Sequence, residues 1–133
     1  MSGWAAAWNR SPRNRERVLL IALGDHLDRS QIVLAELVNF PAGEPADISS
    51  EQLMVGDLVS QNRILRQTAV RSGDNAHAAV LDELERVLLA IKHAPRDASG
   101  EQMDELRGRV ESEGLLFKIR VVSSNVREKG TKL

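Results

Sequence analysis

The sequence predicts an all-α protein, an antiparallel up-down four-helix bundle. Three observations predict it: one segment with a clean apolar stripe, three further segments with a similar apolar period, and short connections between the last three segments. Short connections place neighbouring helices antiparallel. The clean stripe lies in residues 74–93, and Leu84 and Leu88 are its expected central core residues. Its apolar positions are Val80/Leu81, Leu84, Val87/Leu88 and Ile91.

Composition limits the function classes. With 133 residues, 42% of them hydrophobic, the chain can form one domain with its own core. It carries 18 basic and 19 acidic side chains, so we expect no nucleic-acid partner. The absence of cysteine excludes disulfides, thiolate metal sites and cysteine nucleophiles. The longest apolar run in the body, residues 18–23, is far below the roughly 20 residues that span a bilayer.

The first helix is expected over residues 14–39. Leucines and valines repeat at helical spacing through this segment, and Phe40 followed by Pro41 ends it, because the residue before proline is biased away from the helical region. Residues 41–47 contain two prolines and a glycine, which indicates a loop.

The second helix is predicted to begin at Ser49 and to end near Ser72. Ser49 and Gln52 have capping-box spacing, and Ile48 and Leu53 occupy the positions of a hydrophobic staple on either side.

The third helix follows after a tight turn. Gly73 supplies a left-handed stop and Asp74 is the expected N-cap. We expect this helix to end near His93, before Pro95.

The fourth helix is predicted to begin at Ser99, where Ser99 and Gln102 repeat the capping-box spacing. Residues 115–121 also alternate like a strand, but a lone strand would have no partner, so we predict a helix with a kink allowed at Gly114. Residues 47–54 resemble residues 97–104, which suggests either a duplicated helical hairpin or shared capping chemistry, and we favour the second explanation. The bundle is expected to occupy residues 14–128, with a flexible or juxtamembrane segment at 1–13 and a tail at 129–133.

His26 is the most notable titratable residue, because Asp25 and Asp28 lie on either side of it. Imidazole with nearby carboxylates serves as a proton-coupled switch or a metal ligand. The other histidines, His77 and His93, lie about 24 Å apart at ~1.5 Å per helical residue, so they cannot share a metal. We favour a capping, helix-dipole or salt-bridge role for His26 and expect neither metal nor cofactor.

Asn62 falls on the inner stripe of the second helix, between Leu58 and Leu65. Such an amide is either satisfied across the bundle or lines a pocket, and we favour a buried amide that fixes helix register. Ser30, which lies between stripe positions of the first helix, is interpreted in the same way, as a buried polar side chain bonded across the bundle. Gly24 indicates either a close helix approach or a gap for a ligand, and we favour packing.

No nucleophile elbow, Ser-x-x-Lys pair or phosphate-binding glycine loop is present, so we predict that the protein is not an enzyme.

The amino-terminal end differs from the rest of the chain. Two tryptophans, Trp4 and Trp8, enclose three alanines, and four arginines follow by residue 17. Tryptophan followed by arginine is typical of the flank of a transmembrane helix at the membrane surface. An ordinary solvated tail is the alternative, and both interpretations stay open.

Four segments together resemble the carboxy-terminal helical domain of bacterial membrane proteins of the zinc-finger or anti-sigma-factor-like kind. These segments are residues 15–39, 57–69, 81–95 and 111–128. The resemblance implies a helical domain beyond a single transmembrane segment, attached in fuller members to a cytoplasmic zinc-binding module that regulates a sigma factor. It implies no catalytic residues. This chain lacks the cysteines of such a module, and its arginine-rich flank favours a cytoplasmic side.

We therefore expect a non-enzymatic sensory or protein-interaction domain of a membrane-anchored regulator, placed outside the cytoplasm. The alternative is a free-standing cytoplasmic helical adaptor or oligomerisation module. The expected partner is a protein, and the membrane would be reached only through a segment missing from this chain. The first helix would carry a signal as a shift against the other helices. The candidate relay residues are Gly24, Asp25, His26, Asp28 and Asn62.

Overall fold

The computed structural model describes residues 12–132, with side chains from residue 14 to residue 130. It confirms the four-helix bundle. The first three helices are α2 (Pro12–Val38), α3 (Ser49–Arg71) and α4 (Asn75–His93). The fourth consists of α5 (Gly100–Glu111), the short 3₁₀ turn η1 (Ser112–Gly114) and α6 (Leu115–Lys132). No described helix is both long enough and apolar enough to cross a membrane.

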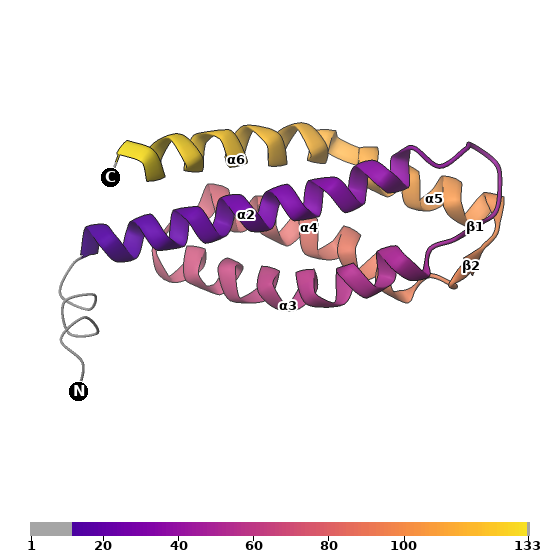
Figure 1. Ribbon diagram of the computed structural model, residues 1–133, viewed down its shortest axis with the longest axis horizontal. Helices are drawn as coiled ribbons and strands as arrows, with labels where there is room; N and C mark the ends of the chain where they lie inside the picture. Colours follow the sequence, from indigo (N-terminus) through magenta and orange to yellow (C-terminus); the bar gives the residue numbers. More distant parts are fainter. Residues whose placement is uncertain (1–11, 133) are drawn as a thin grey trace.

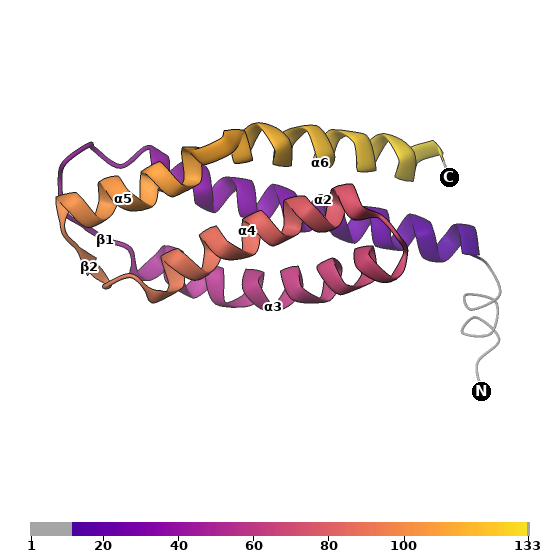
Figure 2. The same cartoon turned by 180° about the vertical axis from the view of Figure 1, so that it is seen from behind.

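The helices are arranged as two closely packed pairs. Helix α2 lies along α6, and α3 lies along α4 (Figure 1). The two-stranded sheet of β1 (Ala46–Asp47) and β2 (Asp97–Ala98) closes one end, called here the β end. The other end holds the first turns of α2, the turn between α3 and α4, and the last turns of α6 (Figure 2). We call it the open end.

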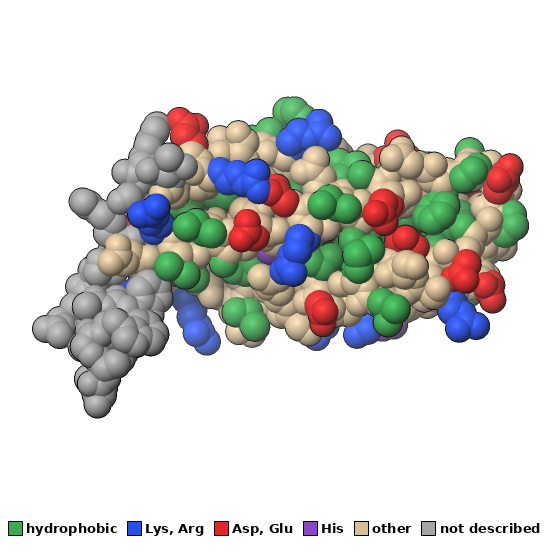
Figure 3. Space-filling model, in the orientation of Figure 1, with side chains coloured by type: hydrophobic (Ala, Val, Ile, Leu, Met, Phe, Trp, Pro, Cys, Tyr) green, Lys and Arg blue, Asp and Glu red, His purple; other side chains and the backbone are tan. Residues whose placement is uncertain are grey.

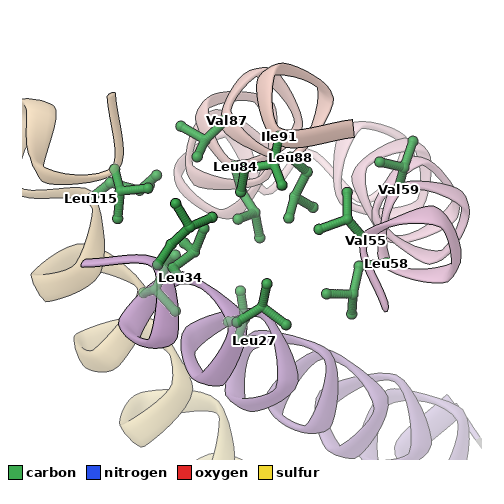
Figure 4. Close-up of a cluster of buried hydrophobic side chains, with 14 of the residues drawn as sticks. Leu27, Leu34, Val55, Leu58, Val59, Leu84, Val87, Leu88, Ile91 and Leu115 are labelled. Atoms are coloured by element: carbon green, nitrogen blue, oxygen red, sulfur yellow. The ribbon is translucent and has the colours of Figure 1, made fainter. Parts of the chain in front are cut away.

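The core is aliphatic and runs between all four helices. The stripe of α4 faces inward as predicted, because Leu84 and Leu88 are fully buried. Side chains from α2, α3 and α6 point toward them (Figure 4). Fully burying a leucine stabilises a fold by roughly 1.5–3 kcal/mol, so this core accounts for the association of the helices.

Two of the predicted helix starts are confirmed. Ser99 Oγ accepts a hydrogen bond from the Gln102 amide at 3.1 Å, and Gln102 Oε1 accepts one from the Ser99 amide at 2.8 Å. Asp74 Oδ1 accepts from the His77 amide at 3.2 Å and so caps α4. Gly73 has a φ of 74°, the left-handed conformation expected of it.

Helix α3 begins at Ser49 as predicted, but the capping box predicted there is wrong. Ile48 is the N-cap residue, and its own amide donates to the Arg96 carbonyl at 2.9 Å next to the β1–β2 pair. Gln52 Nε2 instead donates to the carbonyls of Ile91 at 3.1 Å and Ala94 at 2.8 Å, which satisfies the end of α4. Pairing with β2 therefore overrides the local capping signal. The expected staple partner Leu53 is 80% exposed.

The pairing of β1 with β2 also changes the interpretation of the two similar segments. Ala46 pairs with Ala98 and Asp47 pairs with Asp97, so the two segments meet in an antiparallel register. Because only the second segment forms a capping box, shared capping chemistry does not explain their similarity.

Residues 115–121 are helical, as predicted. The kink allowed at Gly114 is present, and it involves two consecutive residues in the left-handed region: Glu113 with a φ of 56° and Gly114 with a φ of 67°. Helix α6 continues to Lys132, beyond the expected boundary at residue 128.

At the β end, helix α5 holds the connection between α2 and β1. Arg107 donates through Nε to the Val38 carbonyl at 3.2 Å and through Nη2 to the Phe40 carbonyl at 2.5 Å, so it caps the end of α2. The Gly43 amide donates to Asp104 Oδ1 at 2.9 Å, and this bond lowers the pKa of Asp104.

Candidate functional site

The relay residues predicted on the first helix separate onto different sides of α2. His26 is buried toward α3, Asp28 faces α6 together with Gly24, and Asp25 is exposed. Successive residues of an α-helix point about 100° apart, since it has 3.6 residues per turn, so neighbours in sequence cannot share one face. The structure brings His26 and Asn62 together, and it does not join Asp25 or Asp28 to them.

His26 and Asn62 form a buried bridge between three helices. Both side chains are fully buried. The distance from His26 Nε2 to Asn62 Oδ1 is 2.9 Å, and Asn62 Nδ2 donates to the Leu81 carbonyl of α4 at 2.7 Å. Asn62 is thus the buried amide, bonded across the bundle, that its stripe position predicts. We call this arrangement the His26–Asn62–Leu81 bridge.

The bridge fixes the tautomer of His26. A carbonyl can only accept, so Asn62 must turn its amide nitrogen to Leu81 and its oxygen to His26. His26 Nε2 therefore carries the hydrogen, and Nδ1 is left as an acceptor. Within residues 12–132, neither Nδ1 of His26 nor Oγ of Ser30, one helical turn further on, has a hydrogen-bond partner. Two unsatisfied buried atoms thus lie beside a satisfied bridge.

Burial dominates the electrostatics of His26. It lowers the pKa of the imidazole, and the hydrogen bond to Asn62 and the nearby Gln61 side chain offset part of that effect, while the positive charge of Arg29 adds to it. Arg29 itself donates to the Gln61 side chain. His26 is therefore neutral at pH 7. A proton added at Nδ1 would put a charge and an unpaired donor into an apolar core.

A second polar contact joins α2 to α6. Ser123 Oγ donates to Asp28 Oδ1 at 2.7 Å, and Arg127 forms an ion pair with the other carboxylate oxygen of Asp28. One turn earlier, a Cβ added at Gly24 would lie 3.5 Å from both Val126 Cγ2 and Arg127 Cγ. These are ordinary van der Waals distances, so Gly24 packs against α6 and leaves no gap for a ligand.

Sequence reasoning missed Ser123 and Arg127. Asp28 and Arg127 are about a hundred residues apart, and only the antiparallel register of α2 and α6 brings them together. A weak signal existed, because serine and arginine at i and i+4 on a helix share one face, but that pattern does not name its partner.

Neither of two clefts in the described part of the chain contains His26. One, of about 490 Å³, lies at the open end between α2, α3 and the start of α4, and its apolar walls include Leu20, Leu23 and Leu65. The other, of about 450 Å³, lies between α4 and the kink after α5. In the described part of the chain, no group of three or more histidine, aspartate or glutamate side chains is placed to hold a metal ion.

Comparison of the chain with protein-family models, with curated proteins and with solved structures finds no match. The resemblance to anti-sigma-factor-like membrane proteins therefore stays a hypothesis. The tryptophan pair Trp4 and Trp8 on which the membrane-flank interpretation depends lies outside the described residues.

Proposed function

We propose that this chain is a non-enzymatic sensory domain of a membrane-anchored regulator of the anti-sigma-factor-like kind, placed outside the cytoplasm. Helix α2 carries the signal by moving against the other helices. The observation that supports this proposal is the His26–Asn62–Leu81 bridge, which ties α2 to α3 and α4 through polar atoms in an otherwise aliphatic core.

The bridge contributes less to the free energy of folding than an apolar core at the same positions can. Well-packed apolar side chains of similar volume often stabilise a core as well as a buried polar pair or better. The unsatisfied Nδ1 of His26 adds a further cost. A buried hydrogen bond is directional, however, so it admits one position of α2 and resists intermediate positions. Such a bond suits an element that switches between discrete arrangements.

The contacts of α2 with α6 are also directional polar contacts that fix one position of α2. Asp28 bonds to Ser123 and Arg127, and Gly24 packs against Val126 and Arg127 of α6. A sliding motion of α2 would break the Asp28 contacts and the His26–Asn62 bond together. Since α2 begins at the open end, a displacement imposed on its first turn would pass along the rigid helix to both contacts.

A non-catalytic role is favoured because the His26 and Asn62 side chains bond to each other and to the Leu81 backbone carbonyl instead of facing a cleft. A general acid or base must reach its substrate within hydrogen-bond distance. His26 is fully buried and lines neither the cleft at the open end nor the cleft between α4 and the kink after α5.

One observation favours the alternative, a free-standing cytoplasmic helical adaptor. Large apolar side chains lie on outward faces, with Leu53 80% exposed, Ile64 65% exposed and Phe117 68% exposed. Figure 3 shows such side chains between charged ones on the face formed by α2 and α6. Exposed apolar groups of this kind are found at protein-interaction surfaces when they gather into patches.

The test is to lock α2 against α6. The chain has no cysteine, so Gly24→Cys with Val126→Cys would form a single disulfide between two positions in contact, because a Cβ at Gly24 lies 3.5 Å from Val126 Cγ2. We expect the locked variant, in the membrane-anchored parent protein, to hold sigma-dependent reporter output at one level with or without the inducing stress. Reduction of the disulfide should restore the response.

Two controls accompany this test. Asp25→Asn changes an exposed charge on the same helix and should leave reporter output unchanged. Circular dichroism of the 133-residue chain should show that each variant is folded. A normal stress response from the oxidised, folded double-cysteine variant would rule out movement of α2 as the signal and would favour the passive adaptor.

A further inference from the structure

The open end of the bundle exposes apolar side chains that a helix normally buries. Residues 18–23 of α2 are apolar on every side, which is typical of a helix surrounded by protein or lipid. Leu23 is buried, but Val18 is 51% exposed, Leu19 42% and Ile21 47%. In both Figure 1 and Figure 2 the first turns of α2 extend past the turn between α3 and α4.

Basic side chains lie beside these exposed groups, with the acidic Glu16 between two of them. Arg15 and Arg17 lie in the turn before them and are exposed. Lys129 of α6 is exposed as well, and its neighbour Gly130 lies against Leu20 and Ile21, with 3.8 Å from its Cβ position to each. In residues 10–17 the sequence has four arginines and one glutamate, so the balance of charge there is positive.

The β end carries the opposite charge. Its exposed side chains include Glu44, Asp47, Asp97, Glu101 and Asp104. A chain with a net charge of −1 thus has a basic end and an acidic end. Near an anionic surface, this separation of charge would turn the open end toward that surface.

We propose that the open end is a contact surface for an anionic phospholipid bilayer. Val18, Leu19 and Ile21 enter the headgroup region, while Arg15 and Arg17 bind lipid phosphates. Apolar side chains that enter the interface, with arginines at its edge, are the features by which interfacial helices bind lipid. The open-end cleft continues this apolar surface between α2 and α3. The proposal does not depend on the α2 relay.

A bilayer fits this surface better than nucleic acid does. A nucleic acid would match the arginines alone, and it would leave the exposed aliphatic groups in water. Aliphatic side chains do not stack on bases as aromatic rings do. A lipid surface offers both negative charge and an apolar interior within the length of one helical turn.

The experiment measures co-sedimentation of the 133-residue chain with vesicles. We expect binding to an equimolar mixture of phosphatidylglycerol and phosphatidylcholine, weak binding to phosphatidylcholine alone, and release at high salt. Arg15→Gln with Arg17→Gln should lower the partition coefficient about 25-fold, from about fivefold per charge. Val18→Ser with Ile21→Ser should lower it by at least about tenfold, because both side chains lose their apolar contact with lipid.

The matched control is Leu53→Ser with Ile64→Ser. These two side chains of α3 are more exposed than Val18 and Ile21, yet they lie outside the proposed surface, so vesicle binding should not change. The locked Gly24→Cys and Val126→Cys variant should also bind vesicles normally, which separates this proposal from the relay.

Three results would overturn the proposal. The first is no binding to the anionic vesicles. The second is an equal loss of binding in the α3 control, which would indicate general hydrophobic adsorption. The third is an absence of vesicle binding together with a concentration-dependent dimer that the Val18→Ser with Ile21→Ser variant no longer forms. A second copy of the chain would then be the occupant of this surface.

Discussion

Replacing His26 and Asn62 separately and then together measures what the buried bridge contributes to stability. His26→Leu leaves Asn62 Oδ1 buried without its donor, and Asn62→Leu leaves His26 Nε2 and the Leu81 carbonyl without the amide. A buried polar group that loses its partner costs about 1–3 kcal/mol. Each single variant should therefore lower the free energy of unfolding by about that amount.

The double variant should be less destabilised than the sum of the two single variants. It removes both polar groups at once, and leucine is close in volume to histidine and has the same branched shape as asparagine. Apolar replacement of a whole buried polar pair is often neutral or stabilising. We expect a free energy of unfolding near that of the native protein, and a coupling energy between the two positions of at least about 1 kcal/mol.

The assay is urea unfolding followed by far-ultraviolet circular dichroism at mildly alkaline pH, where His26 is neutral in folded and unfolded chains alike. Additive effects of the two substitutions would refute the reasoning, because they would mean that the bridge contributes nothing as a unit. The matched control is His93→Leu, which replaces an exposed histidine at the end of α4 and should change stability little.

Two further predictions concern protonation and backbone packing. Burial lowers the pKa of His26 in the native chain. Below the ordinary pKa of 6.5 the unfolded chain therefore binds a proton at His26 that the native chain does not bind. The free energy of unfolding should fall as the pH is lowered from 6.5 to the native pKa, by at most about 1.4 kcal/mol per pH unit. That part of the slope should be absent from the His26→Leu variant in urea titrations at a series of pH values. Gly100→Ala should destabilise by about 1–3 kcal/mol, because its Cβ would overlap the Gly43 carbonyl. Gly108→Ala in the same helix, with open space around it, should stabilise by about 0.5–1 kcal/mol, and equal effects of the two alanines in thermal unfolding would contradict this account.

The helices could be predicted because their signals are local. The stripe of α4, the left-handed Gly73, the N-cap Asp74 and the capping box at Ser99 depend on residues within a turn or two of each other. The same kind of signal failed at Ser49, because the pairing of Ile48 with the Arg96 carbonyl fixes the backbone there. No residue near Ser49 in the sequence reports that contact.

The candidate site could be predicted only in part. The position of Asn62 on an apolar stripe indicated a buried and satisfied amide, but it did not identify His26 as its partner. Two helices can face each other in several registers that bury the same leucines, and the apolar pattern does not choose between them. The antiparallel register of α2 and α6 likewise decided that Asp28 meets Ser123 and Arg127 and leaves Asp25 exposed.

The sequence by itself determined the all-α class, the number of helices, most of their ends and the buried stripe of α4, since helical periodicity and capping are properties of neighbouring residues. The tertiary structure alone decided which polar side chains meet, which glycine touches a neighbouring helix and which apolar groups stay exposed at the open end. Those outcomes depend on the relative rotation and register of packed helices. Packing forces over the whole core set that geometry, so no single segment encodes it.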